Sequence, residues 1–199
     1  MKKKMEKEIR CLCDGRMEVR QVEGASGGPK ITGYAAVFHS LSEDLGGFRE
    51  RILPGAFSKS LAERTDVRAL WNHDSNYVLG RTPNTLQVWE DDIGLRFEIT
   101  PPETQWAQDL MKSIDRGDVT QTSFRFITEQ DQFIHAEDEV VYRELIQVGL
   151  IEVSPVTFPA YEATNVQLRG EGMRVVDYTL ELQRLGNLRR FARRFSRVD

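Results

Sequence analysis

The chain has 199 residues, and 27 Lys and Arg against 31 Asp and Glu give it a formal net charge of −4. Its length predicts one domain with terminal extensions. No run of about 18 apolar residues occurs, and Glu6 and Glu8 follow the N-terminal lysines. We therefore expect neither a transmembrane helix nor a secretory signal. The mild acidity argues against nucleic acid as the main partner.

Composition divides the chain into three segments. Residues 1–14 are a polar lead, residues 15–168 carry nearly all of the apolar pattern, and residues 169–199 hold eight arginines against four acidic residues. We expect the middle segment to be the folded domain and the basic tail to have a separate role. Cys11 and Cys13 are the two cysteines, and their spacing predicts neither a disulfide framework nor a metal site.

The middle segment has the pattern of short β-strands. Residues 17–22 and 31–38 flank a glycine-rich turn, which predicts a hairpin. We expect further strands at 67–71, 86–89, 93–99, 121–128, 140–149 and 150–158, and helices at 54–61 and, from a cap at Thr104, up to Gly117. The predicted fold class is mainly β with inserted helices, as a small closed or nearly closed barrel flanked by helices.

Three polar residues lie on or beside these strands. His73 follows the strand that ends at Trp71, and strand ends are where a rigid scaffold presents functional groups. Ser123 alternates with Phe124, so we expect the phenylalanine in the core and the serine on the outer face, beside Arg125. Each also has an ordinary interpretation, as a loop histidine and as a solvent-facing serine.

Glu152 interrupts an apolar run on both sides, and a carboxylate in such surroundings needs a partner. A histidine ring would serve, and so would Arg143. Together, a serine, a histidine and a carboxylate are the groups that nucleophilic acyl transfer requires. The sequence contains no G-x-S-x-G, P-loop, G-x-G-x-x-G or H-E-x-x-H motif.

Several stretches, in their order and spacing, resemble the prohead serine proteases of tailed phages, which are related in fold to the herpesvirus assemblins. The resemblance runs from about residue 17 to 164 and rests on GYAAVF at 33–38, FRERILPGAF at 48–57, DVRALWNHD at 66–74, VLGRT at 78–82, GD at 117–118, SFRF at 123–126 and EVSPVTFPAY at 152–161. It implies an assemblin-like barrel.

The resemblance also implies the catalytic residues. His73 corresponds to the histidine of the Asn-His-Asp motif, Ser123 to the serine of the Ser-Phe-x-Phe motif, and Glu152 is preferred as the third member. Assemblins use a second histidine, which leaves His135 and, less favoured, His39 as alternatives. The family usually has glycine where Arg125 stands, and an arginine there narrows the approach of substrate or brings charge toward an oxyanion.

The function implied is that of an endopeptidase inside the assembling procapsid, in the host cytoplasm. It would cleave scaffold or major-capsid-protein segments and then itself, without a cofactor or metal. The basic tail would bind acidic scaffold segments or be removed by self-cleavage. Because assemblins dimerise, a homo-oligomer is expected, with no membrane partner. The alternative is a non-catalytic scaffold-binding module with the same fold, in which Arg125 marks a lost active site.

Overall fold

The computed structural model describes residues 7–12, 17–20, 28–63, 66–135 and 141–158, and these ranges form ten strands and two helices. The basic tail lies outside them. The elements are β1 (Lys7–Leu12), β2 (Glu18–Arg20), β3 (Lys30–Val37), β4 (Arg49–Ile52), α1 (Ser58–Glu63), β5 (Arg68–Trp71), β6 (Asp74–Arg81), β7 (Leu86–Glu90), β8 (Gly94–Ile99), α2 (Gln105–Asp115), β9 (Gln121–His135) and β10 (Val141–Val156).

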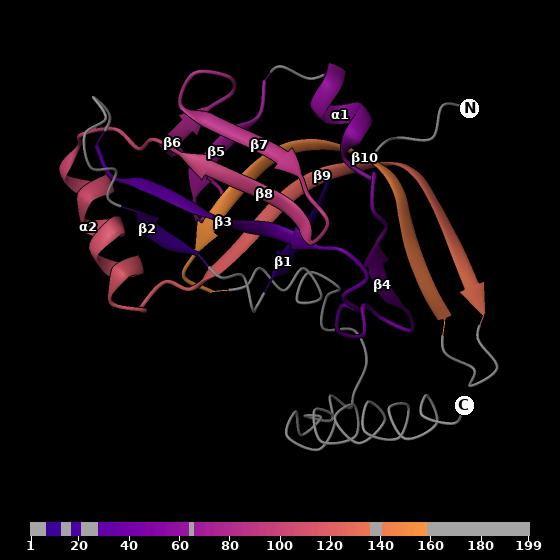
Figure 1. Cartoon of the computed structure of the whole chain (residues 1–199). Helices are drawn as coiled ribbons and strands as arrows, with labels where there is room; N and C mark the ends of the chain where they lie inside the picture. Colours follow the sequence, from indigo (N-terminus) through magenta and orange to yellow (C-terminus); the bar gives the residue numbers. More distant parts are fainter. Residues whose placement is uncertain (1–6, 13–16, 21–27, 64–65, 136–140, 159–199) are drawn as a thin grey trace, which may run out of the picture. The chain divides into compact units, whose positions relative to one another are not determined.

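The strands form two sheets. The larger has six strands in the order β1-β9-β10-β5-β6, and β4 also pairs with β10. Within it, β10 runs antiparallel to β9 and parallel to β4 and β5. The smaller sheet has the order β2-β3-β8-β7. Figure 1 shows β9 and β10 as long curved neighbours that extend together beyond the smaller sheet as a hairpin.

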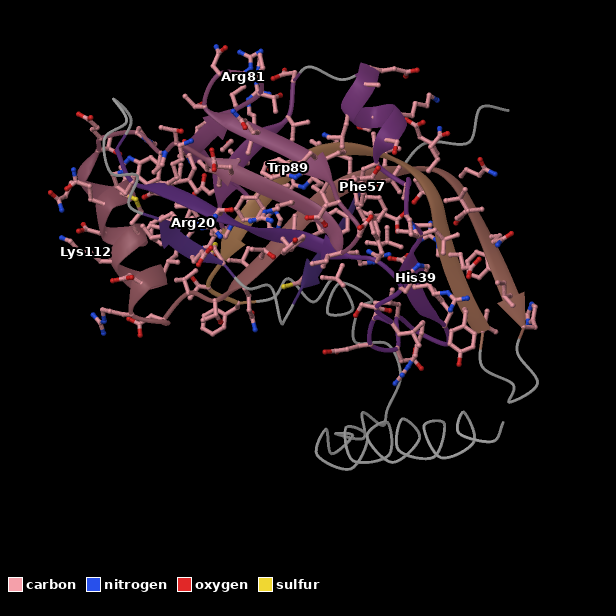
Figure 2. All side chains as sticks on the ribbon, viewed as in Figure 1. Arg20, His39, Phe57, Arg81, Trp89 and Lys112 are labelled. Atoms are coloured by element: carbon pink, nitrogen blue, oxygen red, sulfur yellow. The ribbon has the colours of Figure 1, made fainter. Side chains whose placement is uncertain are left out.

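Both sheets contribute to one core. Phe97 of β8 and Phe124 and Phe126 of β9 are buried in a single apolar cluster. The ring of Phe57, which precedes α1 (Figure 2), meets Phe124 edge-on at a centroid distance of 5.6 Å, and Phe124 stacks on Phe126 at 5.2 Å. The prediction that both strand phenylalanines point into the core is therefore confirmed, and their packing fixes the strand that carries Ser123.

The mainly β class with inserted helices is confirmed, and so is the hairpin of β2 and β3. Helix α2 occupies the predicted range and buries Ala107, Leu110 and Ile114. Thr104 is its N-cap residue, but its side chain makes no capping hydrogen bond. Gly117, in the left-handed region at φ 82°, ends the helix as predicted.

Other boundaries differ from the prediction. Helix α1 begins at Ser58 and not at residue 54, because Gly55 has a φ of 86° and breaks the helical path. The two strands predicted at 140–149 and 150–158 are one strand, β10, with register shifts along it. Strand β9 continues to His135, and β1, β4 and β6 were not predicted.

Candidate active site

His73 lies in the tight turn between β5 and β6. Trp71 pairs with Asp74, which leaves a two-residue loop. Both loop residues have left-handed backbone, with φ 54° at Asn72 and φ 59° at His73, as a type I′ hairpin turn requires. Asparagine and histidine are both enriched in this conformation among non-glycine residues, and its modest strain is of a kind that clusters at functional sites.

Asn72 ties this turn to the end of β10. Its backbone N–H donates to the carbonyl of Pro155 at 3.0 Å, and its side-chain oxygen accepts a hydrogen bond from the backbone N–H of Thr157 at 2.8 Å. The turn is thus fixed to the strand that carries Glu152, and the His73 ring is held relative to that strand.

Ser123 lies near the start of β9, directly opposite Ser154 of β10. Its neighbour Thr122 is buried and donates its hydroxyl to the carbonyl of Tyr34 in β3 at 2.6 Å, so β9 is tied to the smaller sheet at this point. With Phe124 packed in the core on the other face, the Ser123 side chain has little freedom to move.

A β-bulge determines which way Glu152 points. Leu150 pairs with Phe126, and in a regular ladder Glu152 would then face Phe124 and share its core side. The register instead shifts between Leu150 and Glu152, so that Glu152 pairs with Arg125. The extra residue turns the carboxylate to the face that carries Ser123, an effect that bulges often have beside active sites.

The structure brings His73, Ser123 and Glu152 into direct contact. The Nε2 of His73 lies 2.7 Å from Oγ of Ser123, and its Nδ1 is hydrogen-bonded to Oε1 of Glu152. Glu152 is 3% exposed. Since a carboxylate can only accept, Nδ1 carries the proton, and Nε2 is then free to accept the serine proton. This is the arrangement of a nucleophile, a base and a group that orients the base.

Arg125 lies at the carboxylate end of this arrangement. Its Nε is 3.7 Å from Oε1 of Glu152, and its side chain is partly exposed. The expectation that Arg125 narrows the approach of substrate or brings charge toward an oxyanion stays a prediction, and the contact seen for its charged group is with Glu152. The arginine therefore leaves the contacts among His73, Ser123 and Glu152 intact.

The two alternative histidines lie elsewhere. His135 ends β9, twelve residues from Ser123, which corresponds to about 40 Å along an extended strand. His39 follows β3 (Figure 2) and is near Glu144. A hydrogen bond from Gln132 is the main cause that lowers the pKa of Glu144, and the charges of Arg51 and His39 lower it further. Neither histidine is brought to Ser123.

The expectation that Ser123 lies on an outer surface is wrong. Strand β1 lies alongside β9 as the edge strand of the sheet, with Cys11 opposite Ser123, and Ser123 has no exposed surface. Its Oγ also lies 2.8 Å from the backbone carbonyl oxygen of Arg10. The polar composition of residues 1–14 gives no strand pattern, because Glu8 and Arg10 pair with charged side chains of neighbouring strands.

Those charge pairs form a network between β1 and its neighbours. Glu8 accepts hydrogen bonds from Arg143 at 2.7 Å and from Thr128 at 2.5 Å. Burial by itself would raise the pKa of Glu8, but these hydrogen bonds and the charges of Arg143 and Arg10 outweigh it and lower the pKa from the usual 4.5 to about 2. Glu8 is thus held as a carboxylate, and Arg143, which the sequence allowed as a partner of Glu152, pairs with Glu8 and Glu50.

Within the described ranges, no three His, Cys, Asp or Glu side chains are grouped as a metal site would need. The same ranges contain no helix that is long and apolar enough to cross a membrane.

Comparison with known proteins identifies the family. The model of a family described as the caudovirus prohead serine protease matches residues 15–178. The chain belongs to this family. The prohead protease resemblance predicted from the sequence is thereby confirmed, and the protein is a serine protease of capsid maturation.

A solved structure of the bacteriophage T4 capsid assembly protease is also similar to this prohead protease. The two share 12% sequence identity with a TM-score of 0.49, over 79% of this chain and 100% of that one. No curated protein sequence matches the chain.

Proposed function

We propose that this prohead protease cleaves peptide bonds with Ser123 as nucleophile, His73 as general base and Glu152 as the group that orients His73. The observation that carries the proposal is the pair of contacts on one imidazole, Nε2 to Ser123 Oγ at 2.7 Å and Nδ1 to the buried Glu152 carboxylate. Glu152 is preferred over His135 as the third member because only Glu152 contacts His73.

The reaction follows from these contacts. His73 takes the hydroxyl proton as Ser123 Oγ attacks the scissile carbonyl carbon, and the resulting imidazolium is stabilised by Glu152. His73 then gives this proton to the leaving amine, which departs and leaves an acyl-serine. A water molecule, deprotonated by His73, attacks the acyl carbon, and the proton returns to Ser123. Backbone N–H groups beside the serine serve as oxyanion donors in this proposal.

The substrates in this proposal are segments of the scaffold or of the major capsid protein, and afterwards the protease itself. We further propose that it acts inside the procapsid in the host cytoplasm, as a homo-oligomer, and that its two sheets correspond to an assemblin-like barrel. Family membership supports capsid or scaffold proteins as partners. The mainly β composition with two helices supports the fold assignment.

The test is co-expression of the full chain with the major capsid protein of the same phage, followed by intact mass measurement of both. We expect discrete capsid-protein fragments with the wild type and none with Ser123→Ala or His73→Ala. Ser113→Ala, which changes an exposed helix hydroxyl, is the matched control and should behave as the wild type. Equal fragmentation by wild type and Ser123→Ala would refute the assignment of the nucleophile.

A further inference from the structure

Strand β1 lies directly beside the strand that carries Ser123, with Cys11 opposite the serine. It runs antiparallel to β9 through six residue pairs, from Lys7 opposite Ile127 to Leu12 opposite Thr122. It is an edge strand, so its departure would leave a free edge on β9. Extended peptides bind such edges by adding a strand. With β1 in place Ser123 is completely buried, and another polypeptide therefore has no access to its hydroxyl.

One peptide carbonyl of β1 contacts the nucleophile. The carbonyl oxygen of Arg10 lies 2.8 Å from Ser123 Oγ. The same Oγ lies 2.7 Å from Nε2 of His73. The serine has one proton, so Arg10 and His73 compete for it. The contact joins Oγ to the carbonyl oxygen, so the Arg10 peptide group lies beside the nucleophile, and a small rotation that turns the carbonyl carbon toward Oγ would give the geometry of attack. The peptide bond concerned joins Arg10 to Cys11.

The side chain of the same residue is bound by a buried carboxylate. Arg10 Nε and one terminal nitrogen donate to the two oxygens of Glu50, at 2.7 and 3.0 Å. Glu50 is 3% exposed and also accepts a hydrogen bond from Arg143 at 2.9 Å. This pair of hydrogen bonds matches the planar guanidinium of arginine. Lysine and neutral side chains fit the carboxylate less well.

Both observations concern Arg10, whose carbonyl oxygen contacts Ser123 and whose guanidinium is bound by Glu50. We infer that the edge of β9 is the binding site for the substrate strand, that β1 occupies it in cis and is cleaved after Arg10, and that Glu50 selects arginine at this position. The inference rests on the proposed role of Ser123. In the reaction the Arg10–Cys11 bond breaks, the hydroxyl of water joins the Arg10 carbonyl carbon, and the proton goes to the Cys11 amine.

The first experiment follows the N-terminus of the full chain by intact mass after purification. We expect the wild type to yield a species that begins at Cys11 and Ser123→Ala to keep residues 1–10. Arg10→Gln removes a charge that pairs with Glu50 and Glu8 but leaves Arg143 as the partner of both carboxylates, so it should fold and lose this cleavage. Arg20→Gln, an exposed arginine of β2, is the matched control and should be processed as the wild type.

The second experiment measures the arginine preference in trans. The probe is a labelled peptide with the sequence of residues 7–12, in one version with arginine and in another with the neutral isostere citrulline. Hydrogen bonds to a charged partner predict a ratio of kcat/KM for arginine over citrulline of about 10 to 100 in the cleaved wild-type enzyme. The ratio should fall toward one in Glu50→Gln and stay unchanged in Glu18→Gln, a matched exposed carboxylate.

The outcomes separate this inference from the proposed function. If capsid protein is cut in a Ser123-dependent manner while the Arg10–Cys11 bond stays intact, the inference is overturned and the proposed function stands. If Arg10→Gln is processed as fast as the wild type, or the citrulline peptide is cleaved equally well, the role of Glu50 is overturned. If no polypeptide is cut in a Ser123-dependent manner, the proposed function fails, and the inference fails with it.

Discussion

Replacement of Glu152 by glutamine removes one charge at nearly constant shape. The carboxylate is buried and in hydrogen-bond contact with Nδ1 of His73. A unit charge about 3 Å from an imidazolium contributes roughly 5–6 kcal/mol at an effective dielectric constant of about 20. Because the imidazolium forms only as Ser123 is attacked, this energy is lost from the transition state. The expected loss in kcat is therefore about 10⁴-fold.

The assay is the steady-state cleavage of a capsid-protein segment by Glu152→Gln, with kcat and KM separated. We expect KM to change little, because Glu152 faces His73 and Arg125 and not the β9 edge. The matched control is Glu144→Gln, which neutralises another buried carboxylate of β10, one that pairs with Arg51. A loss below tenfold in Glu152→Gln, or an equal loss in both variants, would refute the reasoning.

Three further predictions concern neighbouring groups. Glu8 has a pKa of about 2 in the fold against an ordinary 4.5, so its stabilisation of β1 is complete above pH 4.5 and declines as the pH falls toward 2. By pH 3 the loss of this stabilising free energy reaches at most about 2 kcal/mol. Hydrogen exchange of the backbone amides of residues 7–12, corrected for intrinsic rates, should then show protection reduced by up to about 30-fold. Unchanged protection would contradict the ion-pair network. Arg125→Ala should keep kcat/KM within about tenfold, because a partly exposed pair at 3.7 Å contributes about 1 kcal/mol or less; a greater loss would give Arg125 a direct role in the reaction. Within the described ranges the buried Ser154 hydroxyl has no hydrogen-bond partner, so Ser154→Ala should raise the free energy of unfolding by about 1 kcal/mol in denaturant titration; destabilisation would show that the hydroxyl is satisfied.

The spacing of apolar residues in the sequence predicted those strands and helices that pack one face against the core. Alternation placed Phe124 and Phe126 inside, and helical spacing together with Gly117 placed α2, because burial and backbone conformation act on neighbouring residues. The same local reasoning missed β1 and β4. Their side chains satisfy charges on distant strands, as Arg10 does with Glu50, and such pairing depends on the tertiary arrangement.

The site shows the same division. Position on or beside a strand and, for Glu152, an apolar run on both sides mark Ser123, His73 and Glu152 as candidates, and the family resemblance predicts their roles. Their contact depends on three features that alternation does not reveal: the left-handed turn at Asn72 and His73, the bulge before Glu152, and the register of β9 against β10. The turn has a sequence signal in Asn72, since asparagine is favoured in such loops. A bulge inside an apolar run, such as the one at Ile151, leaves no comparable signal.

The bulge before Glu152 gives β10 one residue more than the pairing with β9 uses. Deletion of Ile151 would give a regular ladder with the same pairs, Glu152 opposite Arg125 and Val153 opposite Phe124, so the carboxylate would stay on the face of Ser123. Insertions and deletions are usually tolerated in loops and poorly in strands. The bulge is an exception, because the loss of its extra residue keeps the pairs on either side, and homologous chains are therefore expected to keep the carboxylate opposite residue 125 with or without the bulge.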